Sequence, residues 1–214
     1  RAYEVYKRVD FINYWLYTFT ATCLLCLVEP FVAIWLGQDF VLTKAILILA
    51  VAIYYFKGIN SGIDIAKNAA GLYYPDRFIP MAEAIANMVI SIVLAKRYGI
   101  AGVLFGTLVS FLALSFWAKP YFVCRDVFEV SFARYAVREG REIVVSVLVA
   151  AGTWYAVSLV SLENVLLSFG VKALLALALS NGLLLLVYFK TSEFQYLRGL
   201  LESAANRIGK RKKA

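Results

Sequence analysis

Two sets of polar side chains, spaced as on helices, stand inside otherwise apolar segments of this 214-residue chain. In the first set, charged and amide residues recur at steps of three and four: Lys57, Asn60, Asp64 and Asn68. The second set has similar spacing and consists of Glu83, Asn87 and Ser91. Such spacing gathers each set on one helix face. Because ionisable groups inside membrane segments are costly and commonly mark a pathway, we predict that both stripes line a substrate cavity.

The residue types suggest what this cavity handles. The Lys57 ammonium is a suitable partner for phosphate or pyrophosphate. Asp64 and Glu83 would bind a coupling cation, Na⁺ or H⁺, or close a cytoplasmic gate by pairing with Lys67 or Arg77. The amide and hydroxyl groups would hydrogen-bond sugar hydroxyls, or simply join helices to one another: Asn60, Asn68, Asn87 and Ser91. A direct Lys57–Asp64 pair would be strained, because two helical turns, roughly 10 Å, separate the residues.

Composition places the elements that carry these groups in a membrane. The chain is 62% hydrophobic and 17% charged, and its mean hydropathy is +0.74, whereas a soluble domain is typically nearer half apolar and a quarter charged. The sequence contains no histidine, which excludes His-based zinc sites and Ser-His-Asp chemistry and argues against an enzyme. The net charge of +8 fits cytoplasmic loops better than nucleic-acid binding.

Hydropathy predicts an all-α fold with six transmembrane helices. They cover residues 11–36, 40–67, 79–94, 100–117, 143–160 and 165–189. Gly99 ends the turn between the third and fourth, and Gly102 and Gly106 form a GxxxG step that lets helices approach closely. Glu29 lies near the far end of the first span, where we expect it to reach interfacial water. We expect residues 119–142 to form a loop carrying a short surface helix over 132–138.

Charge distribution predicts the orientation. Seventeen of the 22 Lys and Arg residues fall in segments that share one side of the membrane with both termini, so both ends should be cytoplasmic. Lys96 and Arg97 fall on the other side, and charge bias does not explain them. Residues 191–214 have helical apolar spacing and a basic end, which predicts an amphipathic helix on the cytoplasmic membrane surface.

Four segments, in this order and spacing, resemble one transporter family: Phe31–Gly37, Ala69–Arg77, Glu83–Ser91 and Gly99–Thr107. Together they resemble the C-terminal half of the polysaccharide and oligosaccharide flippases, including O-antigen-type flippases, of the multidrug/oligosaccharidyl-lipid/polysaccharide exporter superfamily. The resemblance covers about residues 1–190. It implies one lobe of a pseudo-symmetric two-lobe bundle that works by alternating access, with no resident cofactor.

These expectations combine into one functional hypothesis. Residues 1–190 would be the C-terminal transmembrane lobe, and residues 191–214 would be a cytoplasmic amphipathic basic tail. The partner of this lobe would be a missing N-terminal lobe of the same polypeptide. The whole would flip a polyprenyl-pyrophosphate-linked oligosaccharide across the bacterial inner membrane for cell-surface polysaccharide synthesis, in contact with membrane lipid and not with nucleic acid. The alternative is a cation-coupled multidrug or metabolite exporter of the same superfamily, in which Asp64 and Glu83 would matter more than Lys57.

Overall fold

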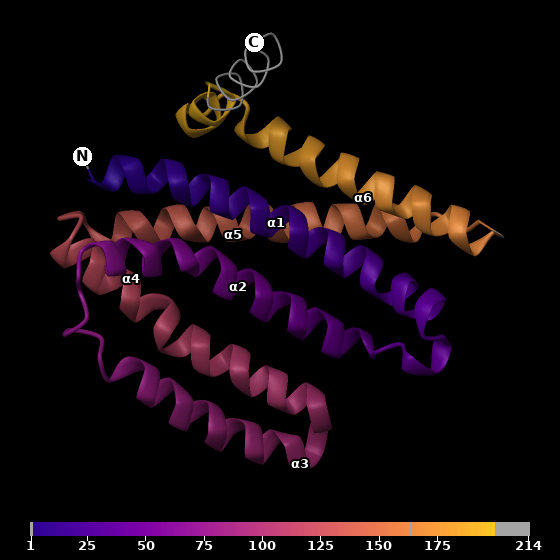
Figure 1. Ribbon diagram of the computed structural model, residues 1–214, viewed down its shortest axis with the longest axis horizontal. Helices are drawn as coiled ribbons and strands as arrows, with labels where there is room; N and C mark the ends of the chain where they lie inside the picture. Colours follow the sequence, from indigo (N-terminus) through magenta and orange to yellow (C-terminus); the bar gives the residue numbers. More distant parts are fainter. Residues whose placement is uncertain (1, 163, 200–214) are drawn as a thin grey trace, which may run out of the picture.

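Helices make up all the regular structure in residues 2–162 and 164–199, the part of the chain that the computed structural model describes (Figure 1). In chain order they are α1 (Ala2–Trp35), the short 3₁₀ helix η1 (Gln38–Phe40), α2 (Lys44–Ala69), α3 (Ile79–Ala113), α4 (Ser115–Asp126), α5 (Phe132–Ser158) and α6 (Val165–Tyr188). Five segments are long and apolar enough to cross a membrane: α1, α2, residues 79–126, α5 and α6. The predicted all-α, multi-pass membrane class is confirmed.

The third candidate span, residues 79–126, folds back on itself at Gly99. This residue has φ 57° and ψ −134°, a backbone conformation that glycine adopts without steric cost. The arms then pack closely, because a Cβ at Gly102 would clash with the Leu94 carbonyl and one at Gly106 with Ser91. The predicted turn and the predicted GxxxG packing are therefore confirmed. Five candidate spans thus correspond to six rod-like segments, since residues 79–98 and 100–126 run antiparallel.

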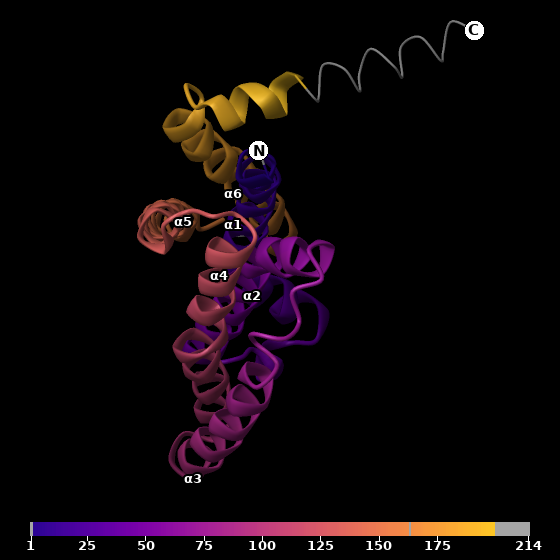
Figure 2. The ribbon, with the colours of Figure 1, turned by 90° about the vertical axis from the view of Figure 1, so that its left-hand side faces the viewer.

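Helix α1 is the centre of the bundle and packs against α2, α5 and α6. Its contact with α2 is close, because a Cβ at Gly58 would overlap the ring of Tyr17. The Asn13 amide also donates a hydrogen bond to the Gly58 carbonyl at 2.9 Å. The hairpin of α3 and α4 lies on the side of α2 away from α6 (Figures 1 and 2). Glycines and small polar groups thus position the α2 stripe between α1 and the hairpin.

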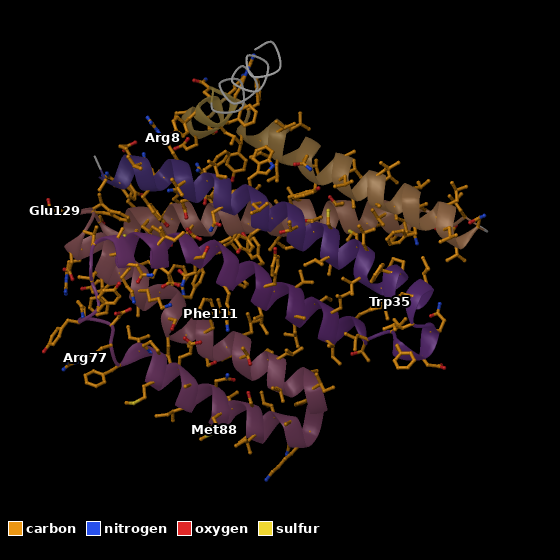
Figure 3. The ribbon with its side chains drawn as sticks, in the orientation of Figure 1. Arg8, Trp35, Arg77, Met88, Phe111 and Glu129 are labelled. Atoms are coloured by element: carbon orange, nitrogen blue, oxygen red, sulfur yellow. The ribbon has the colours of Figure 1, made fainter. Side chains whose placement is uncertain are left out.

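The bundle has two distinct ends. Figure 3 shows Arg8, Arg77 and Glu129 at one end, which also holds the start of α1 and the end of α6, and Trp35 at the opposite end. We call these the N-terminal end and the Trp35 end. The N-terminal end gathers the segments that the charge distribution assigned to the cytoplasm. The assignment of that end to the cytoplasm itself stays a prediction.

Three local predictions are corrected. The first predicted helix, residues 11–36, starts earlier than expected, because α1 already begins at Ala2. The predicted loop over 119–142 shrinks to residues 127–131, and no separate surface helix exists at 132–138, because α5 is one continuous helix that starts there. Ser131 occupies the N-cap position of α5, and its side chain makes no capping hydrogen bond. Of the predicted tail helix, residues 192–199 are helical, and 200–214 lie outside the described residues.

Candidate functional site

The first predicted stripe lies on α2 and faces the hairpin. Lys57 is exposed, and its ammonium lies 5.8 Å from the centre of the Phe111 ring, at cation–π distance. Asp64 accepts hydrogen bonds from the Lys119 ammonium at 3.0 and 3.3 Å. Asn68 is exposed near the end of the helix. These contacts confirm a shared face for Lys57 and Asp64, since both meet the second arm of the hairpin.

Asn60 is the most unusual member of this stripe. Its side chain is buried, with 2% of its surface exposed. Neither its amide nitrogen nor its amide oxygen has a hydrogen-bond partner within the described residues. Leaving a buried polar group unpaired typically costs about 1–3 kcal/mol. Asn60 therefore has unused capacity to bind a water molecule or a polar ligand group.

The second stripe lies within the hairpin itself. Glu83 accepts a hydrogen bond from the Ser115 hydroxyl. Asn87 accepts one from the Ser91 hydroxyl at 2.8 Å and another from the Thr107 hydroxyl at 3.3 Å. The bonds from Ser115 and Thr107 join the first arm to the second, and the Ser91 hydroxyl also reaches the Val103 carbonyl of the second arm at 3.3 Å. The polar groups of this stripe are thus already engaged in holding the two arms together.

The two stripes approach residues 107–119 from different helices, and within the described residues no hydrogen bond or ion pair joins one stripe to the other. The first reaches this segment through Phe111 and Lys119, and the second through Thr107 and Ser115. The predicted gate pairs are also replaced: Lys67 pairs with the buried Asp76 at 2.6 Å, not with Asp64 or Glu83. The second arm of the hairpin therefore stands between the predicted halves of the cavity.

A buried charged cluster, which the sequence did not predict, joins α1 to α5. Arg138 donates to the Asp10 carboxylate and to the Glu142 carboxylate, both at 2.9 Å. The Tyr6 hydroxyl donates to the other Asp10 oxygen at 3.0 Å. Glu139 completes the cluster, and one oxygen from each of the three carboxyl groups lies within 4.8 Å of the others. We call Asp10, Arg138, Glu139 and Glu142 the charged cluster.

The cluster pairs one guanidinium with three carboxyl groups that are each at most 5% exposed. Carboxylate oxygens at this separation are also the ligands that hard cations prefer. Arg138 already supplies positive charge to two of them, so the arrangement serves first as a clamp between the helices. The sequence carried one signal for it, namely the Arg138–Glu142 spacing of four on a helix, which is typical of an ion pair.

An apolar groove of about 360 Å³ runs between α1, α2 and α5. Leucine, isoleucine, valine and alanine side chains form most of its walls, together with Phe56 and Trp154. A chain of hydroxyl groups lies along it: Ser146 contacts Thr18 at 2.7 Å and accepts from Tyr55 at 2.8 Å. The groove is thus a mainly apolar slot with a few fixed polar groups, the usual composition of a small-molecule site.

The groove continues toward the Trp35 end into a polar pocket of about 250 Å³, because the two share Glu29, Lys44 and Trp154. The second pocket adds Lys172 and Gln38. Glu29 is exposed there, and its contact with interfacial water stays a prediction. We call the two parts the apolar groove and the rim pocket. Together they have the form of an amphiphile-binding site, with an apolar slot and a charged mouth.

Neither part contains any of the six residues predicted to bind substrate: Lys57, Asn60, Asp64, Asn68, Glu83 and Asn87. On α2 the groove is lined by residues that include Ile48, Ala52 and Tyr55. At 100° per residue, Lys57 points roughly opposite to these positions. The chain therefore presents two separate candidate regions, one on each side of α2. In comparisons with known proteins, no family model, no curated protein and no solved structure matches this chain.

Proposed function

We propose that this chain forms the C-terminal lobe of a transporter that flips a polyprenyl-pyrophosphate-linked oligosaccharide from the cytoplasmic to the outer leaflet by alternating access. The observation that supports this most is the apolar groove, with its charged rim pocket, between α1, α2 and α5. A lipid-linked oligosaccharide has the matching form, since an apolar chain ends in a charged, hydroxyl-rich head. The sequence resemblance to oligosaccharide flippases points in the same direction.

In this proposal the two parts of the site act differently. The polyprenyl chain gains little free energy on leaving the bilayer for the groove, because lipid tails are as apolar as leucine. The selection of this substrate over ordinary membrane lipids must then come from the contacts of its polar headgroup. Lys44 and Lys172 in the rim pocket would attract the pyrophosphate, and Gln38 would hydrogen-bond it or the first sugar. Glu29 would repel the anion and so help its release.

The α2 stripe would serve a second station for the headgroup. Lys57 is exposed and makes no ion pair with the described residues, so its charge is available to a pyrophosphate. The unpaired amide of Asn60 lies one turn away on the same face. Asp64 is neutralised by Lys119 at this site. The N-terminal lobe would complete the cavity, with both ends of the present segment on the cytoplasmic side of a bacterial inner membrane.

A second candidate function is a cation-coupled multidrug or metabolite exporter. The charged cluster favours it, because three buried carboxyl groups gather around a single guanidinium. Such a cluster would bind Na⁺ or H⁺ and change its contacts as α1 and α5 move. In that case the groove would take an apolar drug in place of a polyprenyl chain.

Deletion of the gene separates the two functions. A flippase predicts that completed polyprenyl-pyrophosphate oligosaccharide accumulates in the cytoplasmic leaflet, and that the wild-type gene restores export while a Lys57→Ala variant or a Lys44→Ala/Lys172→Ala variant does not. Lys96→Ala, an exposed lysine at the hairpin turn, is the matched control and should restore export. Unchanged surface glycan with lost drug resistance would instead support the exporter.

A further inference from the structure

A second charged pocket, separate from the groove, opens at the N-terminal end of the bundle. It has a volume of about 360 Å³ and lies between the first turns of α1, the first turns of α5 and Glu193. Four cationic side chains line it: Lys7, Arg134, Arg138 and Arg141. We call it the basic pocket. None of its lining residues belongs to the apolar groove or to the rim pocket.

Three of the four cations come from one face of α5. Arg134, Arg138 and Arg141 are spaced by four and three residues, so their side chains share one stripe of the helix. Arg134 and Arg141 are exposed and form no ion pair with the described part of the chain. Arg138 uses two nitrogens on Asp10 and Glu142, but its buried Nη1 has no hydrogen-bond partner there. The stripe therefore has donors without acceptors.

The two acids that line the pocket, Glu4 and Glu193, reduce the charge of its four cations without cancelling it. Glu4 pairs with Lys7 at 2.9 Å. Partial burial opposes ionisation of Glu193, but hydrogen bonds from its backbone and Ser192 and attraction to Arg138 and Lys7 hold its pKa below the ordinary value.

The acids of the charged cluster take up the charge of Arg138, so Arg134 and Arg141 supply the charge left for a ligand. The N-termini of α1 and α5 add partial positive charge at the same end.

An apolar strip continues from the pocket along the outside of α5. Val137, which lines the pocket, is 75% exposed, and Val144 and Leu148 follow it at helical spacing, 58% and 66% exposed. A cationic pocket that leads into an exposed apolar strip matches a phospholipid, whose phosphate adjoins its acyl chains. Basic pockets between membrane helices on the cytoplasmic side commonly bind anionic headgroups.

We propose that the basic pocket binds the phosphate headgroup of an anionic phospholipid of the adjoining leaflet, with an acyl chain lying along Val144 and Leu148. This site does not depend on the proposed transport function. It would anchor the N-terminal ends of α1 and α5 to the membrane surface. Arg134 and Arg141, which are both exposed, would hold the phosphate.

Native mass spectrometry of the purified protein that carries this chain tests the site, with phosphatidylglycerol and phosphatidylcholine as the probes. We expect tighter binding of phosphatidylglycerol, and a loss of roughly 30-fold in its affinity in an Arg134→Gln/Arg141→Gln variant. The matched control is Lys96→Gln/Arg97→Gln, which removes two exposed cations at the other end of the bundle and should leave the affinity unchanged. Gel filtration would verify that both variants fold.

Three results would overturn the proposal. Equal binding of the two lipids would show that the pocket does not recognise anionic headgroups. An equal loss in the control variant would show that only the total charge matters. Displacement of the lipid by millimolar inorganic phosphate would identify a site for free phosphate, in which the apolar strip has no part. Resistance to phosphate, combined with a selective loss in the α5 variant, supports the lipid site.

Discussion

Removing Arg138 should destabilise the bundle more than removing any other arginine that lines the basic pocket. In an Arg138→Met variant, Asp10 and Glu142 lose the guanidinium that donates to both at 2.9 Å. Only 13% of the Arg138 side chain is exposed, so water would compensate the carboxylates poorly. Breaking a buried ion pair on one side typically costs about 3–5 kcal/mol. For a chain of this size that corresponds to a fall of roughly 10 °C in melting temperature.

Thermal unfolding in detergent, followed by circular dichroism, measures this effect. The matched control is Arg134→Met, one turn earlier on the same face, because Arg134 is exposed and forms no ion pair with the described residues. Replacing Arg138 together with its three acidic neighbours by apolar residues should recover most of the loss, since a buried ion network is often no more stable than apolar packing. If Arg138→Met and Arg134→Met melt at the same temperature, the charged cluster does not clamp α1 to α5.

Three other variants test the remaining contacts. Gly106→Ala should lower the free energy of unfolding by about 1–3 kcal/mol, because the added methyl group would clash with Ser91. The control Gly182→Ala, whose methyl group would enter open space, should be neutral or slightly stabilising. Equal melting temperatures for the two variants would contradict the close packing of the hairpin. Asp64→Asn should change the free energy of unfolding by less than about 1 kcal/mol, because 40% of the Asp64 side chain is exposed. A larger loss of this free energy, measured by chemical denaturation, would show that the ion pair between Asp64 and Lys119 stabilises the fold. Lys57→Ala should abolish glycan export in cells while membrane levels of the protein persist on immunoblots, and normal export would remove Lys57 from the mechanism.

Local patterns predicted the hairpin well, because its determinants are close in sequence. The turn at Gly99 and the small residues at Gly102 and Gly106 can be read from spacing alone, and the structure has the reversal and the close contact there. The helical stripe of Lys57 and Asp64 was predicted for the same reason. The helix that packs against this stripe was not predicted, since helical periodicity defines a face but not the neighbour that covers it.

The charged cluster escaped prediction because its two sides are 128 residues apart in sequence. The first predicted helix began only at residue 11, and residues 132–138 were interpreted as a surface helix. Both interpretations rest on polarity alone, which did not show that Asp10 and Arg138 meet in an ion pair between α1 and α5. The apolar groove was equally hidden, since it depends on how closely α1, α2 and α5 approach.

The most direct test of the proposed function is a flipping assay with the full-length protein in liposomes. A polyprenyl-pyrophosphate oligosaccharide, added to one leaflet, would be followed by its exposure to a lectin or glycosidase on the other side. The account predicts flipping by the wild-type protein and its loss in the Lys44→Ala/Lys172→Ala variant, while Lys96→Ala flips normally. Equal rates in protein-containing and empty liposomes would contradict the flippase proposal, and normal flipping by the Lys44→Ala/Lys172→Ala variant would remove the rim pocket from the substrate path.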